Sequence, residues 1–341
     1  MPTTTTCGIC GAAAELKAGY HHGYVEGSTF AVYHCSSCAA AFARPEVATD
    51  SIYERIYEQA DRVPGYSRYS GYAREILRQA DPLAFLAAQE EAYWAVARVL
   101  TSGQAGRGRP LQVLDAGCGM GYLTHALARA GYAATGCDAS ARAIAHARQS
   151  FTGRFEVEDV SSLARLRPAS FDVVLLVEVI EHAFDPATLA HNALAMVRPG
   201  GRLVITTPNR SLYPARTLWE TELPPVHYWW LTEDAVGVLA KAAGCRMEIL
   251  DFADYYRAHP CAVSIRRRRG SPFGQPVLAA DGRVRHPAAG AVAVRQEGPL
   301  RALLRRSGLL PIVRPLLDRA RGRRRCGTRG VVLCATLTRD T

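Results

Sequence analysis

The 341-residue sequence has little lysine and no long apolar run. Lys17 and Lys241 are its two lysines, so almost all of the basic charge behind its net +10 comes from arginine. No apolar run approaches the roughly 18 residues that a membrane-spanning helix needs, and we expect none. The start, Met-Pro-Thr-Thr-Thr-Thr, has neither the basic nor the apolar segment of a secretory signal. We therefore expect a cytoplasmic protein with one full domain and one or two smaller modules.

Four of the ten cysteines form two Cys-x-x-Cys pairs that are 24 residues apart. Such pairs supply the four thiolates that tetrahedral Zn²⁺ prefers, whereas a redox pair is the alternative in a cytosolic chain. We predict a structural zinc ribbon over residues 1–45, with a short hairpin between Tyr20 and Tyr33. Because four thiolates complete the coordination shell, His21 and His22 are expected on the surface. The predicted ligands are Cys7, Cys10, Cys35 and Cys38.

A glycine-rich turn at residues 113–121, Val-Leu-Asp-Ala-Gly-Cys-Gly-Met-Gly, is the most informative stretch of the chain. Together with the run Thr-Gly-Cys-Asp-Ala at 135–139, it predicts one βαβ nucleotide-binding unit. Asp138, at the end of the second strand, is placed to accept hydrogen bonds from ribose hydroxyls. A dinucleotide fingerprint needs a glycine at position 122, but the chain has Tyr122 there. A glycine-rich turn without a ligand is the alternative interpretation.

An acid two residues before Gly117, Asp115, narrows the class of ligand that the glycine-rich turn can bind. A carboxylate there repels a pyrophosphate but suits a cationic ligand without phosphates, such as S-adenosylmethionine. This acid–glycine–acid arrangement resembles the first motif of the class I S-adenosylmethionine-dependent methyltransferases. The resemblance covers residues 85–260 and implies an α/β fold with a doubly wound, seven-stranded Rossmann-like sheet. It places the cofactor-binding residues at Asp115, Gly117, Cys118, Gly119, Gly121, Asp138, Asp159 and Glu178, with Asp159 contacting the adenine amino group.

Further apolar runs define the rest of the predicted sheet. Phe171–Val177 is typical of a buried parallel strand, Arg202–Thr207 follows it, and Val331–Thr336 is expected as a final antiparallel strand. Helices are expected over 51–59 and 81–100. The predicted domains are the zinc ribbon at 1–45, a helical linker or lid at 46–100, the methyltransferase core at 101–256, an arginine-rich insertion at 257–328 and the last strand at 329–341.

The tyrosine-rich linker has two interpretations. In the resembled enzymes the helices before the first strand cover the cofactor, whereas plain packing of aromatic rings against the sheet edge is the alternative. Within it, 65–71 is a candidate mobile lid.

His227 and His182 are the predicted catalytic residues. His227 lies in the aromatic segment Leu223–Thr232, which resembles the segment that closes over the acceptor in small-molecule O-methyltransferases, including ubiquinone-pathway enzymes. It is a candidate general base, and a histidine hydrogen-bonded within the loop is the alternative. Glu178, Glu181 and His182 form a second group that could hold a divalent cation. In relatives without that metal, Glu178 lines the cofactor pocket and His182 points at the acceptor.

The segment from Arg257 to Arg325 contains 17 arginines and three acids. We consider an RNA surface, a peripheral membrane contact through 300–325, a site for substrate phosphates, and a coding bias against lysine. The order of cysteine pairs, tyrosine-rich linker and Glu-x-x-Glu-His resembles bacterial methyltransferases of small molecules or glycans, so we expect O-methylation of such an acceptor. An RNA methyltransferase is the alternative. The chain lacks an Asn-Pro-Pro-Tyr string, and Cys118 and Cys137 have the character of small packing residues rather than catalytic cysteines.

Overall fold

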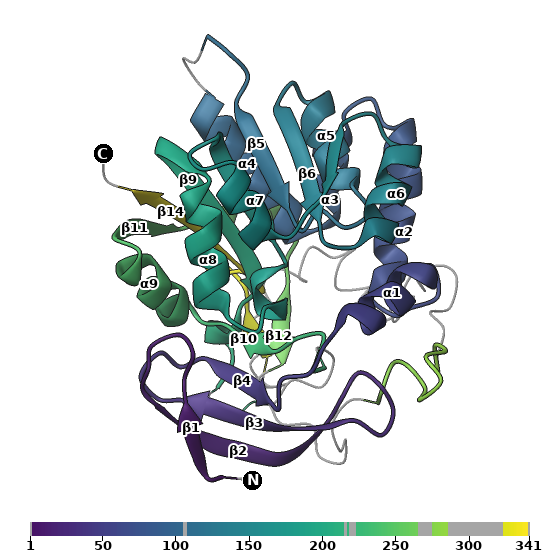
Figure 1. The fold of residues 1–341 in the computed structure, drawn as a ribbon. Helices are drawn as coiled ribbons and strands as arrows, with labels where there is room; N and C mark the ends of the chain where they lie inside the picture. Colours follow the sequence, from purple (N-terminus) through teal and green to yellow (C-terminus); the bar gives the residue numbers. More distant parts are fainter. Residues whose placement is uncertain are drawn as a thin grey trace, which may run out of the picture.

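A seven-stranded sheet forms the centre of the protein, which we describe from a computed structural model covering residues 2–104, 108–214, 217, 223–264, 275–285 and 323–339. The strand order is β11-β14-β9-β8-β5-β6-β7 (Figure 1). The five strands from β9 to β7 pair in parallel, and β14 is antiparallel to both of its neighbours, β9 and β11. This topology confirms the predicted doubly wound α/β fold. The strands are β5 (Gln112–Ala116), β6 (Ala133–Asp138), β7 (Arg154–Val157), β8 (Phe171–Val177), β9 (Val197–Pro208), β11 (Cys245–Ile249) and β14 (Val332–Arg339).

Helices cover both faces of this sheet and give three layers (Figure 1). Because successive residues of a strand point to opposite faces, Val113 packs with the first group of helices and Leu114 with the second. The first group is α3 (Pro82–Gln89), α4 (Glu91–Gln104), α5 (Tyr122–Arg129) and α6 (Ala141–Ser150); the second is α7 (Val160–Leu166), α8 (Pro186–Ala195) and α9 (Glu233–Ala242).

Short polar side chains begin most of these helices. Ser140 caps α6, Asp159 caps α7 and Asp185 caps α8, each by accepting a hydrogen bond from a backbone N–H of the first turn. Thr232 caps α9 in the same way, as the sequence predicts, and Glu233 and Asp234 place negative charge at the positive end of that helix.

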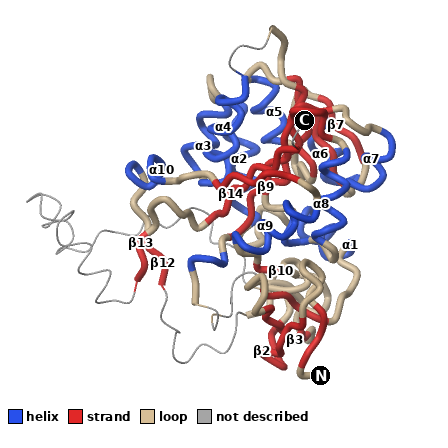
Figure 2. Tube along the Cα trace, turned by 90° about the vertical axis from the view of Figure 1, so that its left-hand side faces the viewer, coloured by secondary structure: helices blue, strands red, loops and turns tan. Residues whose placement is uncertain are grey.

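A second, antiparallel sheet is built from the N-terminal residues 2–45 and one distant strand; we call it the N-terminal sheet. Its order is β1-β2-β3-β4-β10, and β2 and β3 form the predicted hairpin. The strands are β1 (Thr4–Thr6), β2 (Ala13–His22), β3 (Thr29–Cys35), β4 (Ala41–Arg44) and β10 (Trp229–Trp230). Figure 2 shows β10 where the two sheets meet, and one hydrophobic core runs from the N-terminal sheet to a face of the large sheet.

Four details differ from the sequence-based expectations. The single helix expected over 81–100 is two helices, because Glu90 adopts extended backbone angles between α3 and α4. The candidate lid at 65–71 is the start of helix α2 (Tyr66–Glu75). His21 is 0% exposed rather than on the surface, since it packs near Trp230. The edge strand β11 was not predicted.

The remaining elements connect these layers. They are α1 (Asp50–Glu58), η1 (Ile76–Arg78), η2 (Ile180–His182), η3 (Arg210–Leu212), α10 (Ala253–Ala258), β12 (Ala262–Ser264) and β13 (Arg323–Arg325). Of the arginine-rich segment, 265–274 and 286–322 lie outside the described residues, so Arg266–Arg269 and most of the 300–325 stretch do too. Across the described ranges, no helix combines the length and apolarity that crossing a membrane requires.

Candidate active site

A cavity of about 1260 Å³ opens where β5, β6 and β8 end, between the large sheet and the N-terminal sheet. This is the edge at which open parallel sheets bind ligands. The glycine turn, Asp138, Glu178 and the histidines His182 and His227 all line it. Its other walls are rich in tyrosine: Tyr24, Tyr53, Tyr57, Tyr66, Tyr69, Tyr93 and Tyr122. The volume exceeds that of a typical single-ligand pocket and suits a cofactor together with a second molecule.

The glycine turn presents its backbone to this cavity. Gly117 has a φ of +79°, and a Cβ there would lie 2.7 Å from Val179 Cγ2, so a larger residue does not fit. The Gly119 N–H donates to Asp138 Oδ2 at 2.9 Å, and the Ser140 N–H donates to Asp138 Oδ1 at 2.9 Å. Burial raises the pKa of Asp138, while these two bonds oppose the shift. The carboxylate is therefore held rigidly at the cavity wall, as ribose recognition requires.

Two residues predicted to bind the cofactor do not line the cavity. Asp115 is 2% exposed and accepts a hydrogen bond from Thr124 Oγ1 at 2.7 Å, and burial raises its pKa to about 6. Its side chain points from β5 towards α5, and it holds the turn on the side away from the cavity. Gly121 is required for packing, because a Cβ on it would lie 2.6 Å from Ala147 Cβ. Both residues shape the turn without reaching the ligand space.

The other predicted cofactor residues do line the cavity. Cys118 lies in the turn itself and is buried. Asp159 is exposed at the rim and accepts hydrogen bonds from the N–H and the hydroxyl of Ser162, at 2.9 and 2.8 Å. These bonds to Ser162, above all the backbone one, lower the pKa of Asp159, so it is an anionic acceptor at neutral pH.

Two acidic side chains lie deep in the cavity. Glu178 has a φ of +55°, a backbone conformation that L side chains adopt rarely, and its Oε1 is buried without a hydrogen-bond partner among the described residues. Glu181 is 0% exposed; its Oε2 accepts from Thr207 Oγ1 at 3.0 Å, and its Oε1 has no such partner within the described ranges. Burial raises the pKa of Glu181 to about 8 and that of Glu178 well above its usual value.

The two predicted catalytic histidines lie side by side, with ring centroids 4.5 Å apart and ring planes at 70°. Nδ1 of His182 hydrogen-bonds to the Val226 carbonyl. A carbonyl can only accept, so Nδ1 carries the proton and Nε2 keeps its lone pair. Burial lowers the pKa of both rings, so both are neutral at neutral pH. His227 Nδ1 is buried and, among the described residues, unpartnered, so the alternative of a histidine satisfied within its loop does not hold for this nitrogen.

The proposed divalent-cation group is not gathered in this structure. Nε2 of His182 lies 3.9 Å from Glu181 Oε1, and Nδ1 is engaged by a carbonyl. Among the described residues, the one group of three or more potential ligands that converges is formed by the four cysteines.

The four cysteines have the geometry of a tetrahedral metal site. Their sulfur atoms all lie within 4.8 Å of one another, with Cys7–Cys38 and Cys10–Cys35 separations of 3.7 and 3.4 Å. A tetrahedral site with Zn–S bonds of about 2.3 Å separates its sulfurs by roughly 3.8 Å. The hydrogen bond between the two thiols lowers the pKa of Cys7 to about 5 and raises that of Cys38, so Cys7 is the readier thiolate of the pair. The residues present therefore fit Zn²⁺.

Two tyrosines of the predicted tyrosine-rich linker, Tyr53 and Tyr57 of α1, line the cavity and point to one side of their helix because they are four residues apart. Sequence reasoning did not single out Tyr24. Tyr24 comes from the β2–β3 hairpin, and no local pattern marks it.

Comparisons with known proteins agree with this geometry. Residues 80–249 match the family described as a methyltransferase domain. The ubiquinone biosynthesis O-methyltransferase of Albidiferax ferrireducens is 40% identical over 106 residues, which are 29% of this chain and 42% of that enzyme. The enzyme of the same name from Paracidovorax citrulli is 40% identical over 111 residues, which are 30% and 47% of the two chains. The chain thus matches less than half the length of these curated relatives.

Among solved structures, a SAM-dependent methyltransferase from Archaeoglobus fulgidus aligns with 73% of this chain and 96% of its own, at 14% identity and a TM-score of 0.42. The seven-stranded topology, the glycine turn facing Asp138 and the match over residues 80–249 lead to one conclusion. Residues 80–249 form a methyltransferase domain.

Proposed function

We propose that this chain transfers the methyl group of S-adenosylmethionine to a hydroxyl of a small, polyhydroxylated molecule or glycan. The supporting observation is a set of three buried polar atoms that lack hydrogen-bond partners among the described residues and belong to residues lining one cavity. Each buried polar group without a partner costs about 1–3 kcal/mol, so an acceptor with several hydroxyl groups is favoured over an apolar one. The atoms are Tyr24 Oη, Glu181 Oε1 and His227 Nδ1.

In this proposal the general base is His182 rather than His227, the residue predicted for that role, because the hydrogen bond from Nδ1 to the Val226 carbonyl leaves Nε2 of His182 with its lone pair. Its Nε2 takes the proton of the acceptor hydroxyl, while the oxygen lone pair forms a bond to the methyl carbon. The electrons of the broken carbon–sulfur bond stay on sulfur, which leaves as a neutral thioether. His227 packs against the His182 ring, and it accepts a hydrogen bond from the methyl acceptor or donates one to it. Little else is required, because the reaction depends chiefly on holding donor and acceptor in line.

The proposed cofactor contacts lie at the ends of three strands, β6, β7 and β8. Asp138 accepts from the ribose hydroxyls, Asp159 from the adenine amino group, and Glu178 lies beside the amino acid part. Cys118 and the backbone at Gly119 complete the wall. In the N-terminal sheet, the four cysteines hold a structural Zn²⁺, since a shell of four thiolates leaves no position open for a substrate.

The RNA and membrane hypotheses rest on arginines that lie largely outside the described residues, and both remain predictions, as does the cytoplasmic location.

The test is methyl transfer from isotopically labelled S-adenosylmethionine to a panel of sugars, glycosides and catechols, followed by mass spectrometry of the products. We expect label on a hydroxyl oxygen of a sugar or glycoside. His182→Gln should reduce the rate by about 100-fold or more, which is the size of a general-base contribution. His191→Gln, on the exposed side of α8, is the matched control. Label on nitrogen or carbon, or an unchanged rate for His182→Gln, would contradict the proposal.

A further inference from the structure

Tyr24 belongs to the N-terminal sheet module, yet its side chain lines the cavity of the methyltransferase domain. It follows β2 in the β2–β3 hairpin and is 5% exposed. Its hydroxyl is buried and has no hydrogen-bond partner among the described residues. A phenol hydroxyl is usually paired when it is buried, so an unpaired one on a residue that lines a cavity indicates a ligand group.

The backbone of Tyr24 is fixed on two sides. Its N–H donates to the Pro224 carbonyl at 2.6 Å, which ties it to the segment that carries Val226 and His227. Its carbonyl accepts from the N–H groups of Val277 and Leu278, at 2.9 and 3.0 Å. The position of the hydroxyl is therefore set relative to the histidine pair, because Val226 is also the residue that holds His182.

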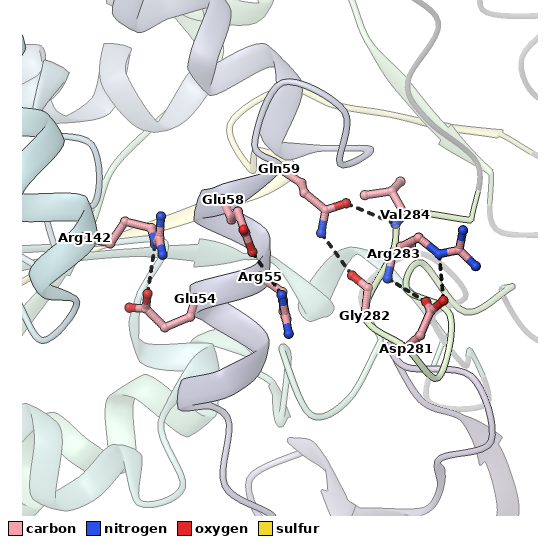
Figure 3. Close-up of polar contacts among 9 residues, drawn as sticks. All are labelled: Glu54, Arg55, Glu58, Gln59, Arg142, Asp281, Gly282, Arg283 and Val284. Atoms are coloured by element: carbon pink, nitrogen blue, oxygen red, sulfur yellow. Dashed lines mark hydrogen bonds and ion pairs between the residues drawn. The ribbon is translucent and has the colours of Figure 1, made fainter.

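Helix α1 fixes the same region to the cofactor side of the cavity (Figure 3). Near its middle, Glu54 accepts from Arg142 at 3.0 Å, close to the Asp138 end of β6. At its end, the Gln59 amide donates to the Gly282 carbonyl at 3.0 Å and accepts from the Val284 N–H at 3.3 Å. The segment 275–285 thus lies between α1 and Tyr24, and the three form one wall.

This wall has an apolar interior that holds it together. Ile56, Val63, Leu223 and Leu278 are buried in one cluster with Tyr24, although they come from four separate parts of the sequence. A side chain anchored in this way keeps its hydroxyl in one place without a bound ligand, and such preorganisation favours specific recognition.

We propose that Tyr24 recognises the acceptor, its hydroxyl forming a hydrogen bond with an acceptor hydroxyl remote from the one that is methylated. The N-terminal sheet is thereby a wall of the acceptor site as well as a metal-binding module. This inference rests on the proposed function, since it assigns a specificity residue to the same site.

The experiment uses the full chain saturated with S-adenosylhomocysteine and two probes measured by saturation-transfer NMR titration. Methyl β-D-glucopyranoside carries several hydroxyls, and cyclohexanol is a ring with a single hydroxyl. Tyr24→Phe removes one oxygen and keeps the ring. Tyr20→Phe is the matched control, because Tyr20 lies on β2 of the same hairpin and is 51% exposed.

We expect Tyr24→Phe to weaken glucoside binding by about fivefold, the effect of one lost hydrogen bond. Binding of cyclohexanol, and of both probes to Tyr20→Phe, should stay within a factor of about two of the unmodified protein. An unchanged glucoside affinity in Tyr24→Phe, an equal loss for both probes, or no glucoside binding by the unmodified protein would overturn the inference. Calorimetric binding of S-adenosylhomocysteine separates the two proposals, because its absence would contradict the methyltransferase site itself.

Discussion

Asp138 joins the glycine turn to the ligand space, since one carboxylate accepts from the N–H groups of Gly119 and Ser140 while it lines the cavity. We expect Asp138→Ala to weaken S-adenosylmethionine binding by about 10- to 100-fold, because two ribose hydrogen bonds to a charged group are lost. Isothermal titration calorimetry measures the change. Asp234→Ala, on the exposed face of α9, should bind the cofactor as the unmodified chain does. Equal affinities for the two variants would rule out Asp138 as the ribose ligand.

Glu181 makes stability depend on pH. Burial raises its pKa to about 8, whereas the unfolded chain has the ordinary value near 4.5. Below the unfolded value both states are protonated; as the pH rises towards 8 the unfolded state alone loses the proton, so folding stability falls across that window. Glu181→Gln removes this loss. We expect its free energy of unfolding to exceed that of the unmodified chain by on the order of 2 kcal/mol at pH 8.

Urea unfolding at pH 5 and pH 8 tests this expectation. The gain in Glu181→Gln should be smaller at pH 5, because this pH lies only slightly above the pKa of the unfolded side chain and little of the loss has accumulated there. Glu248→Gln, on the exposed strand β11, is the control, and its change in stability relative to the unmodified chain should be the same at both pH values. A gain for Glu181→Gln that is the same at both pH values would show that the carboxyl does not titrate as described.

Single residues also show what a sequence can predict about this site. The glycine spacing and the acid at 138 indicate a nucleoside cofactor because few other structures need those residue types in that order. The same motif does not reveal that Asp115 turns away from the cavity, because contact with Thr124 depends on how α5 packs behind β5. His182 and His227 are 45 positions apart, and their edge-to-face contact follows from the tertiary structure alone.

Gly121 is the N-cap residue of helix α5 and has a φ of +82°. In Gly121→Ala the new Cβ would lie 2.6 Å from Ala147 Cβ and 2.7 Å from Phe155 Cε1, so α6 or β7 must move. We expect a loss of about 2–4 kcal/mol in the free energy of unfolding, from backbone strain together with overpacking.

Gly131→Ala is the matched control for this prediction. Gly131 has a φ of +89°, but no atom of the described residues would lie within 4 Å of the added Cβ, so strain alone acts and the loss should be about 1 kcal/mol. Denaturant unfolding measures both variants. Equal losses would show that the contact with α6 and β7 is unimportant.

Elements with a continuous apolar run are predicted well, as β8 demonstrates with Val173–Val177, because a strand buried on both faces is apolar over most of its length. The edge strand β11 was missed since two of its neighbouring side chains, Glu248 and Ile249, are exposed and give no regular pattern. The break between α3 and α4 has a tertiary cause. Glu90 accepts a hydrogen bond from Tyr72 at 2.9 Å and pairs with Arg68 at 2.8 Å, and neither contact can be read from local sequence.

At the scale of the whole molecule, the N-terminal sheet and the methyltransferase domain share a core, although the sequence predicts two modules separated by a linker. The joint is β10, whose Trp229 pairs with Phe42 from a position 187 residues earlier in the chain. Thr232 Oγ1 donates a hydrogen bond to the Cys38 carbonyl at 2.6 Å. A predicted zinc ligand is therefore hydrogen-bonded directly to the segment that follows His227. Two-residue strands of this kind leave no periodic pattern, and such long-range pairing is invisible before the fold is known.

This joint has a consequence for metal removal. Cys35→Ser removes one predicted zinc ligand, and the N-terminal sheet should loosen because so small a module depends on its metal to fold. Since β10 is a strand of that sheet, His227 and Tyr24 lose their positions, whereas the Asp138 side of the cavity is built around β5 and β6 of the large sheet. We expect zinc content to fall below one ion per chain and methyl transfer to the acceptor found in the screen to fall by about tenfold or more. Affinity for S-adenosylhomocysteine should change by less than about threefold.

Cys245→Ser is the control, because Cys245 lies on the far edge strand β11 and belongs to no cluster of metal ligands among the described residues. Zinc analysis by mass spectrometry, calorimetry with S-adenosylhomocysteine and the labelled transfer assay report the three quantities separately. Full transfer activity in a zinc-free Cys35→Ser protein would mean that the acceptor side stands without the metal. A parallel loss of cofactor binding would mean instead that the two sheets unfold as one unit, because a core shared between them transmits the loss of one sheet to the other.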